Sequence, residues 1–391
     1  MAPSNPEWQE GPSANVVIVG AGMVGASAAL RLAQRGVAVT VCEQGDPGSG
    51  ASGTSFAWTN AAGKRPRAYF ELNLAGMAAY RRLQAEAGGV LPGFHPTGHL
   101  EWGADADGWE AIETKVTEAC GWGYAAVRLP TARVLRELEP DLAVDPRRVP
   151  EMVFYPDEGH VDPPVLIGWL LRRAAALGAK VWGGARVVGL DAAAGRVCGV
   201  RLASGEHLAA DAVMCCCGRW TAEVAALAGA RIPLVAPEPA ASEAVGLLLL
   251  TSPLAAAVGR VLSTPELNLR PAGAGRLLLH SRELDRQVAW DAPMEPLPPQ
   301  AAEALSRLRR LVRHTAAARI EGARIGIRPL PADGHTVAGW AGELGGFYAV
   351  VSHSAVTMGP LLGDLVAAEV AGGEASPLLA DFRPGRFAVR G

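Results

Sequence analysis

The chain has 391 residues, of which 49% are hydrophobic and 19% are charged, and its formal net charge is −3. This length and composition indicate a globular protein of about two domains. The small net charge, without any basic block, excludes nucleic acid as an expected partner.

The N-terminal segment, the lengths of the apolar runs and the cysteines predict the cellular location of the protein. Residues 1–14 are polar and rich in proline, so we expect a disordered lead-in rather than a signal peptide. No apolar run approaches the roughly 18 residues that cross a bilayer, so no membrane span is expected. The six cysteines lack C-x-x-C spacing and are expected to be reduced, buried thiols. These features favour a cytoplasmic protein, and no histidine spacing predicts a metal site.

The strongest motif lies at residues 15–43. A β-branched apolar run at 16–19 leads into G-x-G-x-x-G at Gly20, Gly22 and Gly25. An Ala/Leu-rich helix pattern at 23–34 follows, and then a second apolar run at 37–41 that closes on Glu43. Strand, glycine turn, helix, strand and acid in this order indicate a dinucleotide site. The alternative is a packed β–α–β unit without a ligand.

Each part of this motif has an expected task. Gly20 allows the tight turn, Gly22 lets the backbone approach a pyrophosphate, and Gly25 lets the helix pack close to the strand. The helix N-terminus offers free N–H groups to phosphates. Glu43 follows Gly20 by 23 residues, where a carboxylate accepts hydrogen bonds from ribose hydroxyls.

The segment after this motif, residues 45–67, is rich in Gly, Ser and Thr and ends in the basic residues Lys64, Arg65 and Arg67. We interpret it as an extended loop that lies along a second cofactor phosphate and an aromatic ring. The alternative is an ordinary surface loop.

The later elements follow from hydrophobic periodicity and turn residues. Helices are predicted at 68–87, 108–121, 131–138 (capped by Thr131), 165–177, 220–228, 299–311 and 360–370. Strands are predicted at 95–102, 152–155, 180–182, 185–191, 196–202, 207–217, 244–250, 261–264, 268–271, 276–281 and 346–351. Loops or turns are predicted at 156–164, 322–340 and 353–359. The alternation of strands and Pro-rich turns from 232 to 320 is typical of a second, mainly antiparallel sheet.

The chain resembles the flavin-dependent amino acid and amine oxidases typified by D-amino acid oxidase, glycine oxidase and monomeric sarcosine oxidase. The resemblance rests on the opening motif running into GSGAS at 48–52, and on the segments 159–181, 210–229, 326–340 and 345–360. It covers nearly the whole chain.

The resemblance implies an α/β fold with two domains. A discontinuous, Rossmann-like FAD-binding domain would comprise 15–80, 150–231 and 322–391. An α+β substrate domain on a mainly antiparallel sheet would comprise 81–149 and 232–321.

FAD is the expected cofactor, and we expect it to be non-covalent because no cysteine follows Cys217, whereas sarcosine-oxidase-like proteins attach FAD through a cysteine near the C-terminal segment. The residues expected to bind FAD are Gly20, Gly22, Met23, Val24, Gly25, Glu43, Gln44, Ser52, Gly53, Thr54, Ser55, Val187, Cys217, Gly218, Trp220, Arg328, Ser354, Ala355, Val356, Thr357 and Met358.

The sequence contains no second glycine motif for a nicotinamide cofactor, so the organic substrate is the expected reductant. This predicts hydride transfer from a carbon next to nitrogen onto flavin N5, giving an imine that hydrolyses. The expected partners are a small-molecule amine or amino acid and oxygen or another electron acceptor. The alternatives are a tailoring step on a larger amine-bearing metabolite and a flavin-binding protein without turnover.

Three residues are expected to be catalytic. Arg328 lies in GIRP, similar to the family's G-x-R-P, in which the arginine forks onto the substrate carboxylate. His353 would touch flavin or substrate, and Lys64 would lie near the flavin and assist oxygen reduction. The alternatives are a structural arginine, a capping histidine and a solvated lysine. No lysine occurs in the expected substrate-domain sheet, so oxidase and dehydrogenase both stay open.

Overall fold

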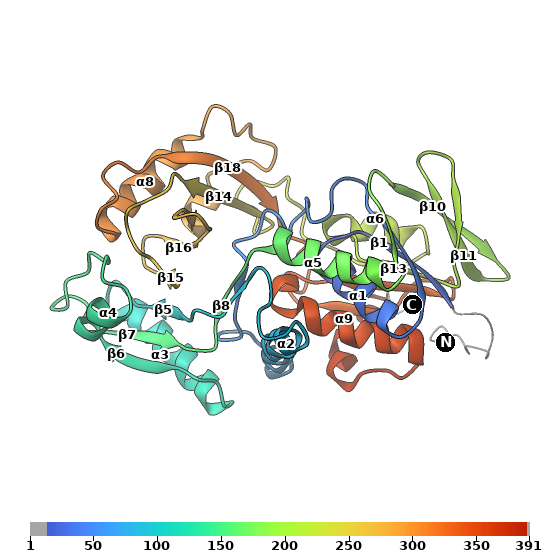
Figure 1. Cartoon of the computed structure of the whole chain (residues 1–391), viewed down its shortest axis with the longest axis horizontal. Coiled ribbons are helices and arrows are strands. Elements are labelled where there is room, and N and C mark those ends of the chain that lie inside the picture. The colour runs from blue at the N-terminus through green and yellow to red at the C-terminus, as the bar shows by residue number, and fades with distance from the viewer. Residues whose placement is uncertain (1–13, 389–391) are drawn as a thin grey trace.

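A computed structural model describes residues 14–388, so nearly all of the expected lead-in lies outside the described residues. A six-stranded sheet has the order β19–β20–β13–β1–β2–β9, and all neighbours are parallel except β19 and β20. It occupies the right-hand half of Figure 1. Its strands are β1 (Asn15–Val19), β2 (Ala38–Cys42), β9 (Lys180–Trp182), β13 (Ala212–Cys215), β19 (Val337–Trp340) and β20 (Phe347–Val351).

A layer of helices packs beside this sheet. Helix α1 (Met23–Gln34) contacts both α5 (Pro163–Ala176) and α9 (Ala355–Gly372), and α2 (Arg67–Glu86) packs against α9. The packing is close because small residues meet: a Cβ atom at Gly363 of α9 would lie 2.6 Å from the Cβ of Ser27 in α1.

Among residues 14–388, helix α9 is the one helix that is long and apolar enough to cross a membrane. The sequence analysis, which expected no apolar run of about 18 residues, did not identify this helix. However, 67% of this helix is buried inside the protein, where it contacts α1 and α2. A core helix explains its composition.

Two three-stranded sheets flank the main sheet. One is the meander β10 (Val187–Ala193), β11 (Arg196–Leu202) and β12 (His207–Ala209), and it packs together with α6 (Thr221–Ala226). The other has the order β3 (Trp58–Thr59), β8 (Gly159–Val161) and β4 (Phe94–His95). In Figure 1, β8 lies between the two halves of the molecule. Short 3-10 helices span Gly218–Trp220, Pro377–Phe382 and Pro384–Phe387.

The left-hand half of Figure 1 is an eight-stranded sheet of order β18–β14–β17–β16–β15–β5–β7–β6. All neighbours are antiparallel except β15 and β5, which are parallel. Its strands are β5 (His99–Glu101), β6 (Val127–Pro130), β7 (Glu151–Tyr155), β14 (Val245–Thr251), β15 (Val261–Ser263), β16 (Asn268–Pro271), β17 (Leu277–His280) and β18 (Ile320–Ile327).

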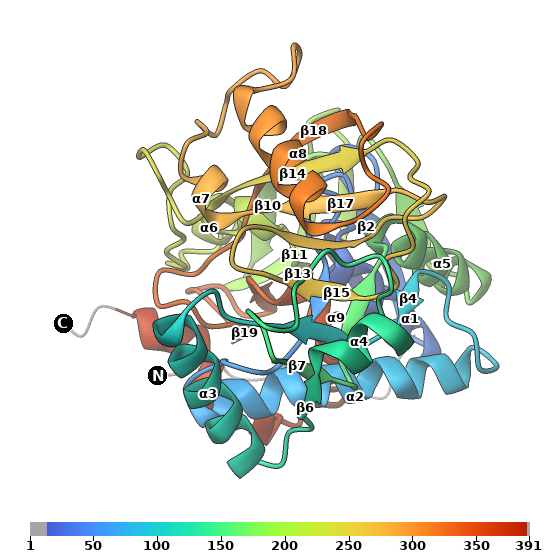
Figure 2. The same cartoon turned by 90° about the vertical axis from the view of Figure 1, so that its left-hand side faces the viewer.

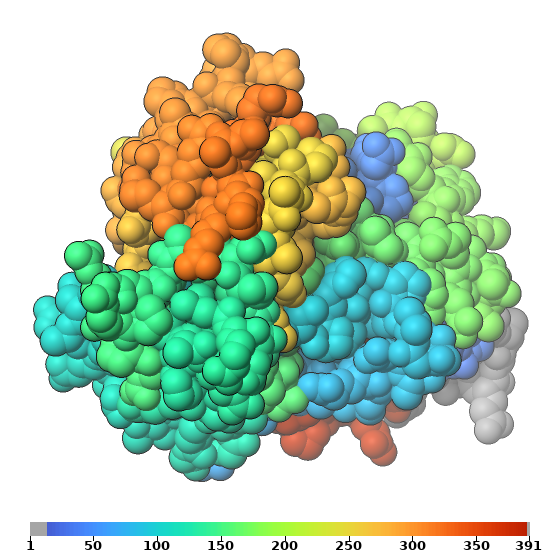
Figure 3. Space-filling model, turned by 60° about the vertical axis from the view of Figure 1, so that its left-hand side comes forward, coloured from blue at the N-terminus to red at the C-terminus, as the bar shows by residue number. Residues whose placement is uncertain are grey.

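Four helices accompany this second sheet: α3 (Ala106–Gly121), α4 (Thr131–Glu137), α7 (Arg282–Asp285) and α8 (Pro299–Leu311). Figure 2 shows α8 near the top of the molecule beside β18 and β14, and α3 and α4 in its lower half near β7 and β6. Figure 3 shows the teal part, which precedes residue 155, directly beside the orange part, which lies beyond residue 260. The β5–β15 pair joins these two parts.

The predicted fold class is confirmed: an α/β half with a Rossmann-like sheet stands beside an α+β half with a mainly antiparallel sheet. The limits of the domains stay a prediction. Strands β7 and β18 belong to the eight-stranded sheet, although 150–155 and 322–327 were assigned to the cofactor domain.

Several element predictions are wrong where pairing partners lie far away in the sequence. The loop expected at 156–164 contains β8, and the loop expected at 322–340 contains β18 and β19. Strand β8 has only three residues, and β18 is only partly buried, so neither has a strong local pattern. Both are held by cross-strand pairs, as in Val245 opposite Ile327.

The run at 207–217 divides into β12 and β13, which lie in different sheets. The carboxylate of Asp211 accepts a hydrogen bond from the Asn15 backbone N–H at 2.7 Å, and the chain changes sheet at this point. The strand expected at 95–102 likewise divides into β4 and β5.

Local details also differ. The turn expected at 353–359 is the start of α9, because the helix begins at Ala355 and continues through Pro360. Thr131 does not cap α4: Pro130 holds that position and the Thr131 hydroxyl is buried without a partner. Cys120 and Cys198 are exposed, so the expectation of buried thiols is wrong for these two.

Candidate active site

A cavity of about 1220 Å³ extends from the glycine turn after β1 to strands of the eight-stranded sheet. The first turn of α9, the loop after β2 and helix α7 all contribute to its wall. Both halves of the protein therefore line one continuous space.

The glycine turn closes one end of this cavity. Gly20 has a φ of +102°, and a Cβ atom there would lie 2.5 Å from the Cys216 carbonyl oxygen. A Cβ atom at Gly25 would lie 2.0 Å from the Gly20 carbonyl oxygen. Only glycine fits at either position, because each Cβ atom would meet fixed backbone.

The start of α1 fits a phosphate. The helix has no acidic residue in its first turn, so the positive end of its dipole is not neutralised by its own side chains. The Met23 N–H donates to the Ser52 hydroxyl at 3.1 Å. Glu43 accepts hydrogen bonds from the backbone N–H groups of Ala21 at 2.8 Å and Gly45 at 3.0 Å. A carboxylate therefore lies beside the turn, as the ribose of a dinucleotide requires.

Most residues predicted to bind the cofactor face this cavity. Those that line it are Gly20, Gly22, Met23, Val24, Glu43, Gln44, Ser52, Thr54, Ser55, Val187, Cys217, Gly218, Trp220, Arg328, Ser354, Ala355, Val356 and Thr357. Gly25, Gly53 and Met358 do not line it. Gly25 packs on Gly20, Gly53 on the carbonyl of Gly48, and Met358 is fully buried against α2.

The three residues predicted to be catalytic all line the other end of the cavity. Lys64 donates from Nζ to the Ser354 hydroxyl at 3.2 Å, next to the start of α9. Tyr69 donates to the same hydroxyl at 3.0 Å. Residues almost 300 positions apart in the sequence are thereby joined.

The two titratable groups among them have lowered pKa values. Desolvation, helped by the charge of Arg282, lowers the pKa of Lys64 to about 8. Desolvation and the cations Lys64, Arg328 and Arg282 lower the pKa of His353 to about 3, although its side chain keeps surface open to the cavity. His353 is therefore neutral at pH 7, and Lys64 loses its proton only in mildly alkaline solution.

Arg328 lines the cavity but is already engaged by protein groups. Its Nη2 lies 2.7 Å from Oδ2 of Asp285 and 3.2 Å from Nε2 of His280. Its Nη1 donates to the carbonyl oxygens of Glu243 and Val245. The expected role on a substrate carboxylate stays a prediction, and the pair with Asp285 was not foreseen.

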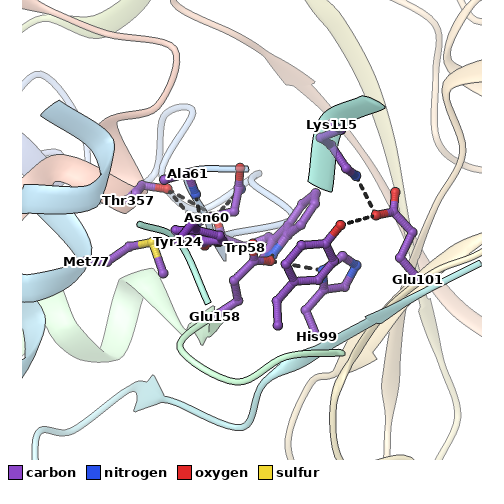
Figure 4. A network of polar contacts seen from close by, with 11 residues as sticks. Trp58, Asn60, Ala61, Met77, His99, Glu101, Lys115, Tyr124, Glu158 and Thr357 are labelled. Carbon is purple, nitrogen blue, oxygen red and sulfur yellow. Dashed lines mark hydrogen bonds and ion pairs between the residues drawn. The ribbon is translucent and has the colours of Figure 1, made fainter. Parts of the chain in front are cut away.

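A buried network beneath the cavity was also missed (Figure 4). Glu158 is fully buried and accepts hydrogen bonds from Trp58 Nε1 at 2.7 Å and the Tyr124 hydroxyl at 2.8 Å. His99 Nδ1 lies 3.0 Å from Glu158 but outside hydrogen-bond geometry. Because Glu158 follows the strand β7 and Trp58 lies in the cofactor loop, the network fixes that loop on the second sheet.

Lys115 reaches the same cavity from α3, where it pairs with Glu101 of β5. Glu101 also accepts a hydrogen bond from Tyr155 at 2.9 Å. The strands of the second sheet hold no lysine, as expected, but a helix beside them supplies one. Its separation from Glu101 by 14 residues offered no signal in the sequence. Among residues 14–388, no group of three His, Cys, Asp or Glu side chains is arranged to hold a metal ion.

The chain is similar in sequence to known proteins of one family. The chain matches the family model DAO, described as FAD dependent oxidoreductase, over residues 15–369. It is 26% identical to glycine oxidase of Geobacillus kaustophilus (strain HTA426) over 365 residues, which cover 90% of this chain and 92% of the relative. Glycine oxidase of Bacillus licheniformis is 27% identical over 213 residues, covering 53% of this chain and 54% of the relative.

Solved structures show the same fold. Glycine oxidase from Geobacillus kaustophilus has a TM-score of 0.80 at 22% identity, covering 96% of this chain and 100% of the other. Iminodiacetate oxidase from Chelativorans sp. BNC1 has a TM-score of 0.80 at 23% identity, with 94% and 98% covered. L-proline dehydrogenase from P. horikoshii has a TM-score of 0.80 at 19% identity, with 96% and 98% covered.

Proposed function

Since this chain belongs to the DAO family of FAD-dependent oxidoreductases, we propose that it oxidises the C–N bond of a small amino acid or secondary amine. One observation carries the proposal: a single cavity joins the glycine turn to the group formed by Lys64, His353 and Arg328. A nucleotide held at the first end would extend towards chemically active side chains at the second. Curated relatives named glycine oxidase support a small amino acid as the substrate.

The residues that would hold FAD are those of the glycine turn, Glu43 and the loop after it, with the start of α9 at the far end. When bound, FAD would supply a ring that takes up a hydride at N5 from the carbon next to nitrogen, and the imine product would hydrolyse in water. Cys217 lines the cavity beside the glycine turn, and no cysteine follows it. We therefore propose non-covalent binding, for which acid precipitation should leave a colourless pellet and a yellow supernatant.

The chain's own residues would set the electrostatics of the second end. His353 is neutral at pH 7, so it can donate or accept a hydrogen bond without placing a charge next to the substrate. Lys64 holds an ammonium group at the N-terminus of α9, which has no acidic residue in its first turn. This pair of positive features would stabilise negative charge that develops nearby, either on a reduced ring or on oxygen.

The test is direct. The purified protein should show a visible flavin spectrum, and small amino acids added without oxygen should bleach it. Admitting oxygen afterwards separates an oxidase, in which colour returns rapidly, from a dehydrogenase that needs another acceptor. Bleaching only by larger amines would favour a tailoring enzyme, and no bleaching by any amine would refute the proposal. We propose a cytoplasmic location, which fractionation of cells would test.

A further inference from the structure

The hydroxyl group of Ser354 accepts hydrogen bonds from two side chains at the start of α9. Lys64 Nζ lies 3.2 Å from this oxygen, and the Tyr69 hydroxyl lies 3.0 Å from it. Ser354 lines the cavity, although only 7% of its surface is exposed. A hydroxyl oxygen has two lone pairs, so Lys64 and Tyr69 together occupy both of them.

The hydrogen atom of the same hydroxyl is not used by the protein. Within residues 14–388, no group accepts a hydrogen bond from Ser354 Oγ, since both of the bonds at this atom are received. A hydroxyl in this state can only donate to a further partner. Because Ser354 lines the cavity, that partner is a group bound there.

Other hydroxyl groups on the wall show how Ser354 differs. Ser52 and Ser55 each accept from a backbone N–H, at 3.1 Å and 3.0 Å, and a backbone N–H does not release its proton. Thr357 donates its own hydrogen to the carbonyl oxygen of Trp58 at 3.3 Å. Among residues 14–388, Ser354 is the one hydroxyl on this wall that accepts from a lysine or arginine side chain.

We propose that Ser354 passes a proton from Lys64 to the electron acceptor that reoxidises the bound flavin. The inference rests on the proposed function and adds the class of acceptor, which is oxygen or a quinone. Either one receives two electrons and one proton from the reduced ring and a second proton from Ser354. The O–H bond of Ser354 breaks towards the acceptor, an N–H bond of Lys64 breaks to restore the hydroxyl, and Lys64 regains its proton from solvent.

The two donors have different tasks in this step. Lys64 is the cation, it is only half-buried, and desolvation lowers its pKa to about 8, so it releases a proton more readily than an ordinary lysine. Tyr69 is buried, and its ring packs on the rings of His335 and Phe382 at 5.2 Å and 5.9 Å between centroids. Tyr69 is therefore a positioning residue that keeps the Ser354 hydrogen directed at the cavity.

Reoxidation of the flavin tests the inference without any amine. The FAD-loaded protein is reduced by light and EDTA and then mixed in a stopped-flow instrument with oxygen, benzoquinone or ferricyanide. Ferricyanide takes up single electrons and no proton, so it does not need a proton donor. We expect Ser354→Ala to slow reoxidation by oxygen and benzoquinone about tenfold or more and to leave the ferricyanide rate within about twofold. The faster of the two proton-taking acceptors in the wild type identifies the source.

Matched variants separate the proton from the packing. Ser354→Thr keeps the hydroxyl and should retain most of the benzoquinone rate. Lys64→Met should show the same selective loss as Ser354→Ala, and the double variant should be no slower than either single one. Ser242→Ala is the control, because Ser242 also lines the cavity but donates its hydrogen to the Ala236 carbonyl at 2.6 Å. Its rates should equal those of the wild type within about twofold.

Two equilibrium measurements accompany the rates: the Kd for FAD and the midpoint potential of the bound FAD. In Ser354→Ala both equilibria should change less than about threefold, because the hydroxyl acts on the acceptor and not on the ring. A larger change in the potential would assign Ser354 to the ring and overturn the inference. An unchanged rate with oxygen and benzoquinone, or an equal loss of rate with ferricyanide, would overturn it as well. Failure of the proposed function is a separate result, because it appears as a wild-type flavin that no amine bleaches.

Discussion

Replacing Gly25 by alanine tests whether α1 packs against the glycine turn so closely that no side chain fits at this position. The new Cβ atom would lie 2.0 Å from the Gly20 carbonyl oxygen, whereas carbon and oxygen atoms that are not bonded stay more than about 3 Å apart. The carbonyl cannot retreat, since Gly20 already packs on the Cys216 backbone. Helix α1 must therefore move away from β1 by about 1 Å.

The cost of such overpacking is typically about 1–3 kcal/mol, and we expect the upper end because both groups in the clash are backbone-linked. For a chain of this size that corresponds to a fall in the melting temperature of roughly 5 °C. The displaced turn should also bind FAD more weakly. Thermal melting of the protein without FAD, followed by an FAD titration, measures the two effects separately.

Gly121 offers a matched control, because it also lies in a helix but a Cβ atom there would meet nothing within 4 Å. Gly121→Ala should leave FAD binding unchanged and raise stability by about 0.5–1 kcal/mol. If Gly25→Ala melts and binds FAD like the wild type, the argument from close packing at the glycine turn is refuted.

Two further predictions concern single side chains in the cavity. Glu43→Gln should raise the Kd for FAD by about ten- to a hundredfold, because a charged acceptor beside the turn is worth about 1.5–3 kcal/mol. An unchanged Kd with a normal circular dichroism spectrum would exclude Glu43 as a cofactor ligand. Lys64 has a pKa of about 8, so it is protonated below that pH and neutral above it. If its charge assists reoxidation of the flavin, the rate should fall as pH rises through about 8, and Lys64→Met should be slow and flat over the same range. A fall in rate near pH 8 that persists in Lys64→Met would assign the titration to another group.

The fold was predictable where the signals are local. At residues 15–43 the glycines, the apolar runs and the acid fix a strand, a turn and a helix with no help from the rest of the chain, and α1 has the predicted ends. Strands β8 and β18 were missed because their short or half-exposed sequences become strands only when distant partners pair with them.

The sequence predicted which residues lie in the candidate site better than it predicted the contacts between them. The GIRP motif predicted Arg328, and the resemblance to the family predicted Lys64 and His353; all three line one cavity. No motif could show that Asp285, 43 residues earlier, would hold Arg328. A sequence pattern can indicate that a residue has a functional role, whereas its hydrogen-bond and ion-pair partners depend on the tertiary packing around it.

The order of strands in the six-stranded sheet has a consequence for synthesis on the ribosome. Strand β13 pairs on one side with β1, near the start of the chain, and on the other side with β20, near its end, and α9 then covers α1 and α2. During translation, the apolar faces of α1 and β13 lack this cover until the final segment emerges. Contacts between such distant parts of a chain form slowly. A nascent chain stopped before β20 should therefore expose apolar surface and recruit chaperones, even though its glycine turn is complete.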